Sequence, residues 1–226
     1  MPEPREITVL LELEREQERR FAGLLTTAER DIDGTPDQPS AKDTFAHAIG
    51  AKQRMHDALT TLRAGGEPDP THDREQVFET YAGRSFTSLE EDAVRLGDAL
   101  VADVEALDAG ALGSSPAWVG ETTLADEMIQ QCVTHGMVLM FEVLCERGAA
   151  EDARRAQVEL VDALPDDVSP LQRSRALYNL ACLDVRTGRE SDAVDALAEA
   201  LRLRPALADH VRDDPELEPV RTRVLG

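Results

Sequence analysis

Two histidines, His47 and His135, are the residues whose type and setting best suit chemistry. His47 lies on the flank of the apolar stripe of one predicted helix, and His135 shares a helical face with Leu124 and Met128. An imidazole gives or takes a proton near neutral pH and is the commonest metal ligand. Rings that point inward can form hydrogen bonds within a core, line a small-molecule pocket or hold a metal ion. The sequence leaves these three interpretations open.

Three further residues are candidates for the lining of a pocket near the two histidines. Tyr81 and Trp118 each combine a large apolar surface with one hydrogen-bonding group, although such side chains are also ordinary core residues. Gln131 lies four residues before His135, which is about one helical turn. We therefore expect a ligand pocket lined by His47, Tyr81, Trp118, Gln131 and His135, in which either histidine is the candidate general acid or base.

The remaining cysteines and histidines give weaker signals. The three cysteines are odd in number and show no Cys-x-x-Cys spacing, so the sequence predicts buried free thiols at Cys132, Cys145 and Cys182. Three histidines lie in polar segments, and we expect them to be exposed: His56, His72 and His210.

The charge of the chain narrows the class of partner. Its 226 residues include 24 Lys and Arg against 45 Asp and Glu, a formal net charge of -21. Such a chain repels phosphate backbones and anionic membranes, so we expect neither nucleic acid nor a membrane as partner. The acidic runs Glu12-x-Glu14-x-Glu16 and Glu90-Glu-Asp92 are expected to be solvated helix faces. With no apolar run near 18 residues and no secretory leader, the expected location is the cytoplasm.

The elements that must position these residues are predicted to be helices. Turn-rich segments separate four long helical patterns, over 6–30, 40–64, 88–110 and 122–146, with a short helix at 74–82. Ser40 with Asp43, and Ser88 with Glu91, form capping boxes at two of the starts. The fourth pattern is apolar around most of its circumference, which is typical of a helix buried on several sides. Residues 1–147 are therefore predicted to form an all-α, up-and-down four-helix bundle.

A second helical pattern occupies residues 148–226. Predicted helices at 149–164, 171–187 and 191–204 include the spacing of one tetratricopeptide repeat, although Asp184 stands where that repeat usually has an aromatic residue. Asn179 occupies the position of an asparagine that contacts peptide backbone in such repeats. One repeat cannot bury its own apolar face, so this module must pack on the bundle, on a protein partner bound through residues 170–205, or on the segment 215–224.

Short motifs in residues 1–147 occur in an order that matches a known family. They are Lys42-Asp-Thr-Phe-Ala-His47, Tyr81, Arg84-Ser-Phe-Thr-Ser-Leu-Glu, Trp118-Val-Gly120, Thr123-Leu-Ala and His135. In this order they resemble the DinB-like superfamily of four-helix bundles, and within it the ClbS/DfsB group. The resemblance implies protection of cells against reactive small molecules, or thiol-dependent transfer or isomerisation in other members, and it admits a homodimer.

The resemblance also implies a divalent metal held by three histidines, two of them four residues apart on one helix. Residues at i and i+4 share a helical face, so both rings can reach one ion. His47 and His135 match two of these ligands, but Gln131 and Leu139 occupy the positions four residues before and after His135. The sequence therefore predicts an incomplete site without a confident cofactor, with a reduced zinc or nickel site as an alternative.

Three functions follow as hypotheses. The leading one is a small-molecule-binding or protective protein, active in stress or toxin resistance, with its pocket near His47 and His135. The second is a non-catalytic scaffold that recruits a partner through the C-terminal helices. The third is a metal- or thiol-dependent transferase or hydrolase in which a histidine acts as general acid or base.

Overall fold

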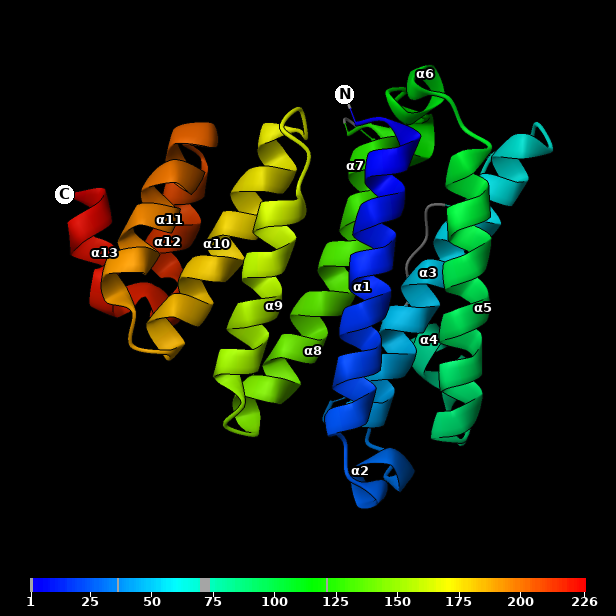
Figure 1. Cartoon of the computed structure of the whole chain (residues 1–226), viewed down its shortest axis with the longest axis horizontal. Coiled ribbons are helices and arrows are strands. Elements are labelled where there is room, and N and C mark those ends of the chain that lie inside the picture. Colours follow the sequence, from blue (N-terminus) through cyan, green and yellow to red (C-terminus); the bar gives the residue numbers. More distant parts are fainter. Residues whose placement is uncertain (1, 36, 70–73, 121) are drawn as a thin grey trace. The chain divides into compact units, whose positions relative to one another are not determined.

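The computed structural model describes residues 2–35, 37–69, 74–120 and 122–226, and its regular elements are helices (Figure 1). Within these ranges there is no β-strand, and one isolated bridge pairs Thr35 with Gln38. The predicted all-α class is therefore confirmed. The chain forms two compact units, Met1–Met140 and Phe141–Gly226. The boundary between these units lies inside a continuous helix, and the predicted division at residue 147 stays a prediction.

Four long helical segments build unit 1. Helices α1 and α3 each pack along α5, and the π-helical segment η2 packs against α1 and α3. The core between them consists of aliphatic and aromatic side chains, each of which stabilises the fold by about 1.5–3 kcal/mol when buried. The segments are α1 (Pro4–Leu24), α3 (Ala41–Arg63), α5 (Phe86–Glu105) and the run α7 (Leu124–Ile129), η2 (Gln130–Thr134) and α8 (His135–Glu146).

The first predicted helix, 6–30, is in fact two helices. Helix α1 ends at Leu24 and α2 (Thr27–Asp31) begins after Thr26, whose side chain and that of Glu29 form a capping box. Arg30 then donates a hydrogen bond to the carbonyl of Ala22, one of the last carbonyls of α1. The capping box therefore supplies a second helix start, which the apolar spacing did not reveal.

The starts of α3 and α5 test the predicted caps. The Ser40–Asp43 capping box is confirmed, because each side chain bonds to the other residue's backbone N–H. The predicted start at Ser88 is wrong, since Ser85 caps α5 by accepting from the Ser88 N–H at 3.2 Å. The Ser88 hydroxyl instead accepts a hydrogen bond from Arg84.

The fourth predicted helix runs without a break from Leu124 to Glu146, with Thr123 as its cap. It is long and apolar enough to cross a membrane by length and composition alone, with a mean hydropathy of 1.3 over 18 residues. The expectation that the chain has no apolar run near 18 residues is a different criterion, because polar residues such as Glu127 and His135 interrupt this stretch. Since 56% of that stretch is buried, as in the core helix of a soluble protein, the criterion is weak support for a membrane span. The structure is compatible with a soluble protein.

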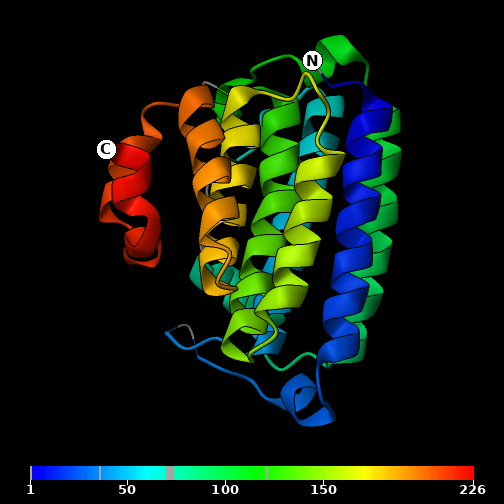
Figure 2. The same cartoon turned by 60° about the vertical axis from the view of Figure 1, so that its left-hand side comes forward.

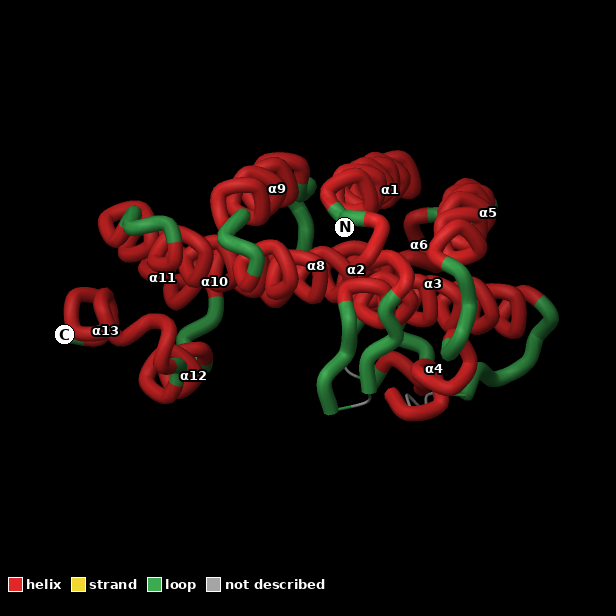
Figure 3. Tube along the Cα trace, turned by 90° about the horizontal axis from the view of Figure 1, so that it is seen from below, coloured by secondary structure: helices red, strands yellow, loops and turns green. Residues whose placement is uncertain are grey.

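Besides α2, three short elements in the described part of unit 1 connect the long helices. The predicted helix at 74–82 is present as α4 (Arg74–Tyr81), which packs on α3 (Figure 3). The contact is close at Gly50, where a Cβ atom would lie 2.7 Å from Val77 Cγ1. The remaining two elements are α6 (Ala109–Leu112) and η1 (Ala117–Val119).

Unit 2 begins with the end of α8 and continues through the predicted C-terminal helices. These are α9 (Ala150–Ala163), α10 (Pro170–Arg186) and α11 (Glu190–Leu203), followed by α12 (Leu207–Asp213), η3 (Pro215–Leu217) and α13 (Glu218–Leu225). Helix α10 packs against α9 and α11, with Gly188 at φ 75° in the turn between α10 and α11. A positive φ strains most residues, and glycine adopts it at the lowest conformational cost because it has no Cβ atom.

The terminal helices cover the apolar face of the α10–α11 pair. Val211, Leu217 and Val220 form one buried cluster with small and aliphatic side chains of α10 and α11, and Figure 2 shows α12 and α13 beside α11. The sequence left three candidates for covering this face: the bundle, a protein partner or the terminal segment. Within unit 2, the terminal segment covers it. Asp184, where the repeat usually has an aromatic residue, is buried and accepts a hydrogen bond from Arg154 of α9.

Candidate functional site

The structure brings His47 and His135 together. His47 lies on α3 and His135 is the first residue of α8, and their Nε2 atoms are 3.2 Å apart. The ring planes meet at 62°, and both side chains are half-buried. At this distance one Nε2 donates a hydrogen bond and the other accepts it, so at least one of the two nitrogens is unprotonated. The ring proton of one Nε2 and the lone pair of the other therefore bond to each other.

A π-helical turn places His135. In η2 the hydrogen bond that ends at His135 runs from its N–H to the carbonyl of Gln130, five residues back. Isolated π-turns within α-helices occur frequently at functional sites. Gln131 lies inside this turn, is half-buried and donates to Glu127 at 2.9 Å. The α-helical spacing that paired Gln131 with His135 therefore does not apply across this segment.

The residue after His135 allows the helices to approach closely. A Cβ atom on Gly136 would lie 3.2 Å from Ala48 Cβ and 3.3 Å from Glu14 Oε1. Contacts this short leave little room for a side chain, so glycine lets the start of α8 approach both α1 and α3. Because Ala48 follows His47 in the chain, this close approach brings the two imidazoles within hydrogen-bonding distance.

Arg54 is a cation beside the same region. It lies two turns after His47 on one face of α3, and its Nη1 and Nη2 atoms are buried with no hydrogen-bond partner among the described residues. Burial lowers the pKa of Arg54, whereas the nearby Tyr81 and Cys132 would raise it when ionised. Arginine does not lose its proton in proteins, so an unpaired buried guanidinium creates a demand for an anion.

The two aromatic candidates lie in different surroundings. Tyr81 ends α4 beside Gly50, with the Arg84 guanidinium 5.4 Å from its ring centre. Burial, followed by Asp92, raises the pKa of the Tyr81 hydroxyl, which therefore stays neutral. Trp118 lies in η1, and its indole Nε1 is buried with no acceptor among the residues that the structure describes. Tyr81 is thus linked to the site through Gly50 and Arg54, whereas no such link is seen for Trp118.

The donor set does not fit the three-histidine metal site that the family resemblance implies. The residues described include no group of three or more His, Cys, Asp or Glu side chains arranged to hold a metal ion. His47 and His135 supply two nitrogens, and Gln131 supplies an amide nitrogen that already donates to Glu127. The other amide atom of Gln131 is a neutral oxygen, unlike the third imidazole that this site requires, so we assign no chemical step to a metal here.

A buried charge cluster lies in the core of unit 1. Lys52 of α3 bonds to Glu14 and Glu18 of α1, and the contact with Glu18 Oε2 is 2.8 Å. All three side chains are almost completely buried, so the expectation that Glu14 lies on a solvated face is wrong. The pKa of Glu14 is raised by burial and then by the charge of Glu18. Cys132 is also buried, and desolvation raises the pKa of its thiol.

A histidine expected to be exposed is in fact paired. His56 Nδ1 lies 2.6 Å from the buried carboxylate of Asp103 on α5, which Arg63 also contacts. This group ties α3 to α5. His210 is exposed as predicted, and His72 lies outside the described residues.

Arg54 and the Glu14–Lys52–Glu18 cluster were not identified as site residues from the sequence. A signal for the cluster exists, because Glu14 and Glu18 continue the helical spacing of Ile7, Leu10 and Phe21 along α1. Asn179, the candidate for peptide binding, is half-buried on α10 of unit 2, and its role stays a prediction. The sequence matches no family model, and neither a curated protein nor a solved structure shows significant similarity to it.

Proposed function

We propose that unit 1 binds a small anionic molecule at the paired imidazoles of His47 and His135. The observation that carries the proposal is the 3.2 Å approach of the two Nε2 atoms, which joins segments 88 positions apart. Both rings remain half-exposed, so a solute can reach them. A π-turn and a close glycine contact hold the second ring in place. Local departures of this kind are expected where a protein positions a functional group.

Arg54 supports an anionic ligand. Its terminal nitrogens are buried without a partner among the described residues, on the face of α3 that carries His47. A carboxylate, phosphate or sulfonate group accepts two hydrogen bonds from one guanidinium, which is the geometry that arginine favours. The neutral hydroxyl of Tyr81 adds one further donor.

The histidine pair gives this site a capacity for proton transfer. When a bound molecule replaces one ring as the hydrogen-bond partner of the other, the ring that carries the hydrogen can donate it, or the ring with the lone pair can accept one, so the pair can act as general acid or base. A bound reactive solute would be held away from other cell components. This fits the protective role that the resemblance to the ClbS/DfsB group implies, and we propose that role for the chain.

The test is an NMR titration of protein labelled at histidine, with benzoate, phenyl phosphate and benzenesulfonate as probes. We expect at least one probe to shift the resonances of His47 and His135 with a Kd of about 1 mM or lower. Arg54→Gln should weaken this binding about tenfold or more, because it removes the charge while keeping hydrogen-bonding groups. Arg155→Gln is the matched control, since Arg155 is 68% exposed in unit 2.

Two results would contradict the proposal. One is equal binding by wild type and Arg54→Gln, and the other is the absence of any shift at either histidine. Elemental analysis of the purified untagged protein, with zinc and nickel calorimetry, tests the metal-dependent alternative. If the wild type binds metal stoichiometrically and both His47→Ala and His135→Ala lose it, the site is a metal centre and not an anion site.

A further inference from the structure

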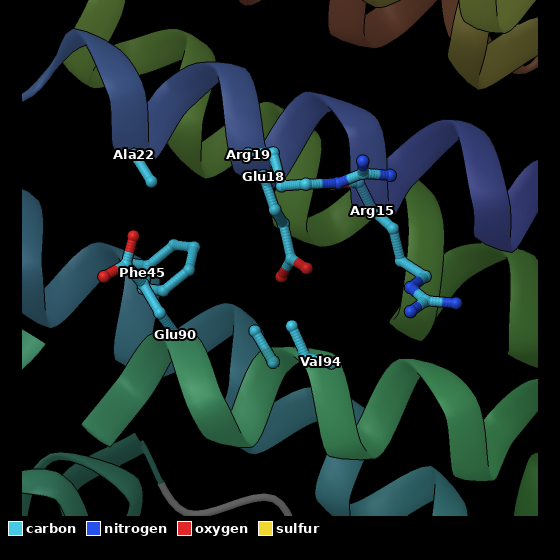
Figure 4. Close-up of a pocket in the computed structure, with 8 residues that line it drawn as sticks. Arg15, Glu18, Arg19, Ala22, Phe45, Glu90 and Val94 are labelled. Carbon is cyan, nitrogen blue, oxygen red and sulfur yellow. The ribbon is translucent and has the colours of Figure 1, made fainter. Parts of the chain in front are cut away.

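A cleft of about 160 Å³ opens between α1 and α5 (Figure 4). Its walls are largely apolar and include Ala22 of α1, Phe45 of α3, and Ala93 and Val94 of α5. Neither His47 nor His135 contributes to this lining. A dry cavity of about 150 Å³ is sufficient to hold a benzene-sized molecule. The cleft is therefore large enough for one small ring or a short branched chain.

One buried carboxylate faces this space. Glu18 is 3% exposed, and Figure 4 shows its carboxyl group directed from α1 into the region between α1 and α5. Its Oε2 accepts a hydrogen bond from Lys52 at 2.8 Å. Its Oε1 is buried and has no N–H or hydroxyl donor among the described residues, although a carboxyl–carboxyl hydrogen bond between Glu14 and Glu18 contributes to the raised pKa of Glu14. A buried acceptor without a donor is destabilising, so this oxygen is ready to accept one from a ligand.

The charges around Glu18 favour a cation in the cleft. Two buried carboxyl groups, on Glu14 and Glu18, share a single ammonium, that of Lys52. Burial and the charge of Glu18 raise the pKa of Glu14, which is the expected response of two buried carboxyl groups that share one cation. An organic cation beside Oε1 can supply a second positive charge.

The two arginines at the margin already have acidic partners. Arg15 contacts Asp98 at 2.8 Å, and Arg19 contacts Glu16 at 3.3 Å. Glu90 adds one further negative charge to the lining. These pairings offset the charges of the two arginines, so they do not oppose a cation bound at Glu18.

We propose that this cleft binds a small organic ammonium ion, namely a primary amine attached to a compact aromatic or branched aliphatic body. Its N–H donates to Glu18 Oε1, and its body contacts Phe45, Ala93 and Val94. This site is independent of the anion site at His47 and His135, and either can exist without the other.

The test uses benzylamine as the probe and benzyl alcohol as its neutral counterpart, at neutral pH, by calorimetry and NMR. We expect benzylamine to bind the full chain with a Kd of about 1 mM or lower, and about tenfold more tightly than benzyl alcohol. Glu18→Gln should lose this tenfold preference. His47→Ala should bind benzylamine as wild type does, which separates this site from the proposed anion site.

A filling variant keeps the test independent of the buried cluster. Val94 is 53% exposed, so Val94→Trp can fill the cleft without disturbing the core and should abolish benzylamine binding. Val9→Trp is the matched control, because Val9 is 51% exposed on α1 and does not line the cleft. Unchanged binding by Val94→Trp, or equal binding of the amine and the alcohol by wild type, would overturn the proposal.

Discussion

Lys52 donates a hydrogen bond to Glu18 across the interface of α3 and α1, with 2.8 Å between Nζ and Oε2 and side chains only 2% and 4% exposed. The same ammonium contacts Glu14, which is fully buried. Two carboxyl groups and one ammonium therefore lie together in the interior of unit 1. Ions removed from water in this way are held in place by one another, so each is sensitive to the loss of the others.

Replacement of Lys52 by methionine should destabilise unit 1 strongly. The variant keeps the apolar stem but leaves two carboxyl groups without a cation, and removing one partner of a buried ion pair costs about 3–5 kcal/mol. Urea denaturation followed by circular dichroism measures this loss. Lys42→Met is a poor control because Lys42 is also buried, so Arg155→Met on the surface serves instead. A loss below about 1 kcal/mol would contradict the cluster described here.

Glu14 should make the stability of the protein depend on pH. Its pKa in the folded state is raised above the ordinary value of 4.5, so its contribution is fully present below that value and is lost as pH rises through the folded-state pKa. The pKa of Lys52 is also raised, so this residue stays charged across that range. Glu14→Gln should therefore flatten the decline in unfolding free energy as the pH rises above 4.5. The check is a series of urea titrations of both proteins across that range. Parallel profiles for wild type and variant would refute this assignment.

Gly50 should tolerate no side chain. A Cβ atom there would lie 2.7 Å from Val77 Cγ1, and valine has few rotamers with which to yield. Gly50→Ala should cost about 1–3 kcal/mol and speed amide hydrogen exchange in α4. Gly23→Ala is the matched control, since Gly23 is helical with no atom within 4 Å of the added carbon, and it should stabilise by about 0.5–1 kcal/mol. Similar changes in unfolding free energy for the two variants would show that α4 does not pack closely on α3 at Gly50.

Deletion of Gln130 should be tolerated better than deletion of a residue from regular helix. The π-turn holds one residue more than an α-turn, so its removal lets the helix close as α with both flanking faces still toward the core. We expect a loss of less than about 1.5 kcal/mol. Deletion of Leu139 is the comparison, because it rotates all later residues by about 100°. Thermal unfolding ranks the two variants, and the reverse order would argue against the π-turn.

The helical elements follow from patterns that act locally. The apolar spacing predicts the long helices of both units, and the Ser40–Asp43 capping box predicts the start of α3, because caps and amphipathic faces depend on residues a few positions apart. The same rules failed where two local signals competed. Thr26 and Glu29 start a second helix inside an apolar repeat, and Ser85 caps α5 because Arg84 engages the hydroxyl of Ser88.

The features of the candidate site depend on contacts between distant segments, so the sequence indicates only part of them. The types of His47 and His135 mark them as candidates, but their 3.2 Å contact depends on the fit of Gly136 against α3. The sequence predicts a solvent-exposed Glu14, because acidic side chains usually lie at the surface. Its position along the helix nevertheless falls on the buried stripe of α1. The π-turn cannot be recognised from the sequence, because the segment is apolar on most sides and its apolar spacing does not show an inserted residue.

The three thiols differ in what they can report about the opening of each unit. Cys132 of unit 1 is buried, whereas Cys145 and Cys182 of unit 2 are only half-buried, so the expectation that all three are buried is wrong for these two. A thiol reagent reacts with the thiolate and needs access to it, so Cys132 is labelled only at the rate at which its surroundings transiently open. The unmodified chain therefore reports the opening of unit 1 in one mass-spectrometric time course, with the half-buried thiols of unit 2 as an internal reference.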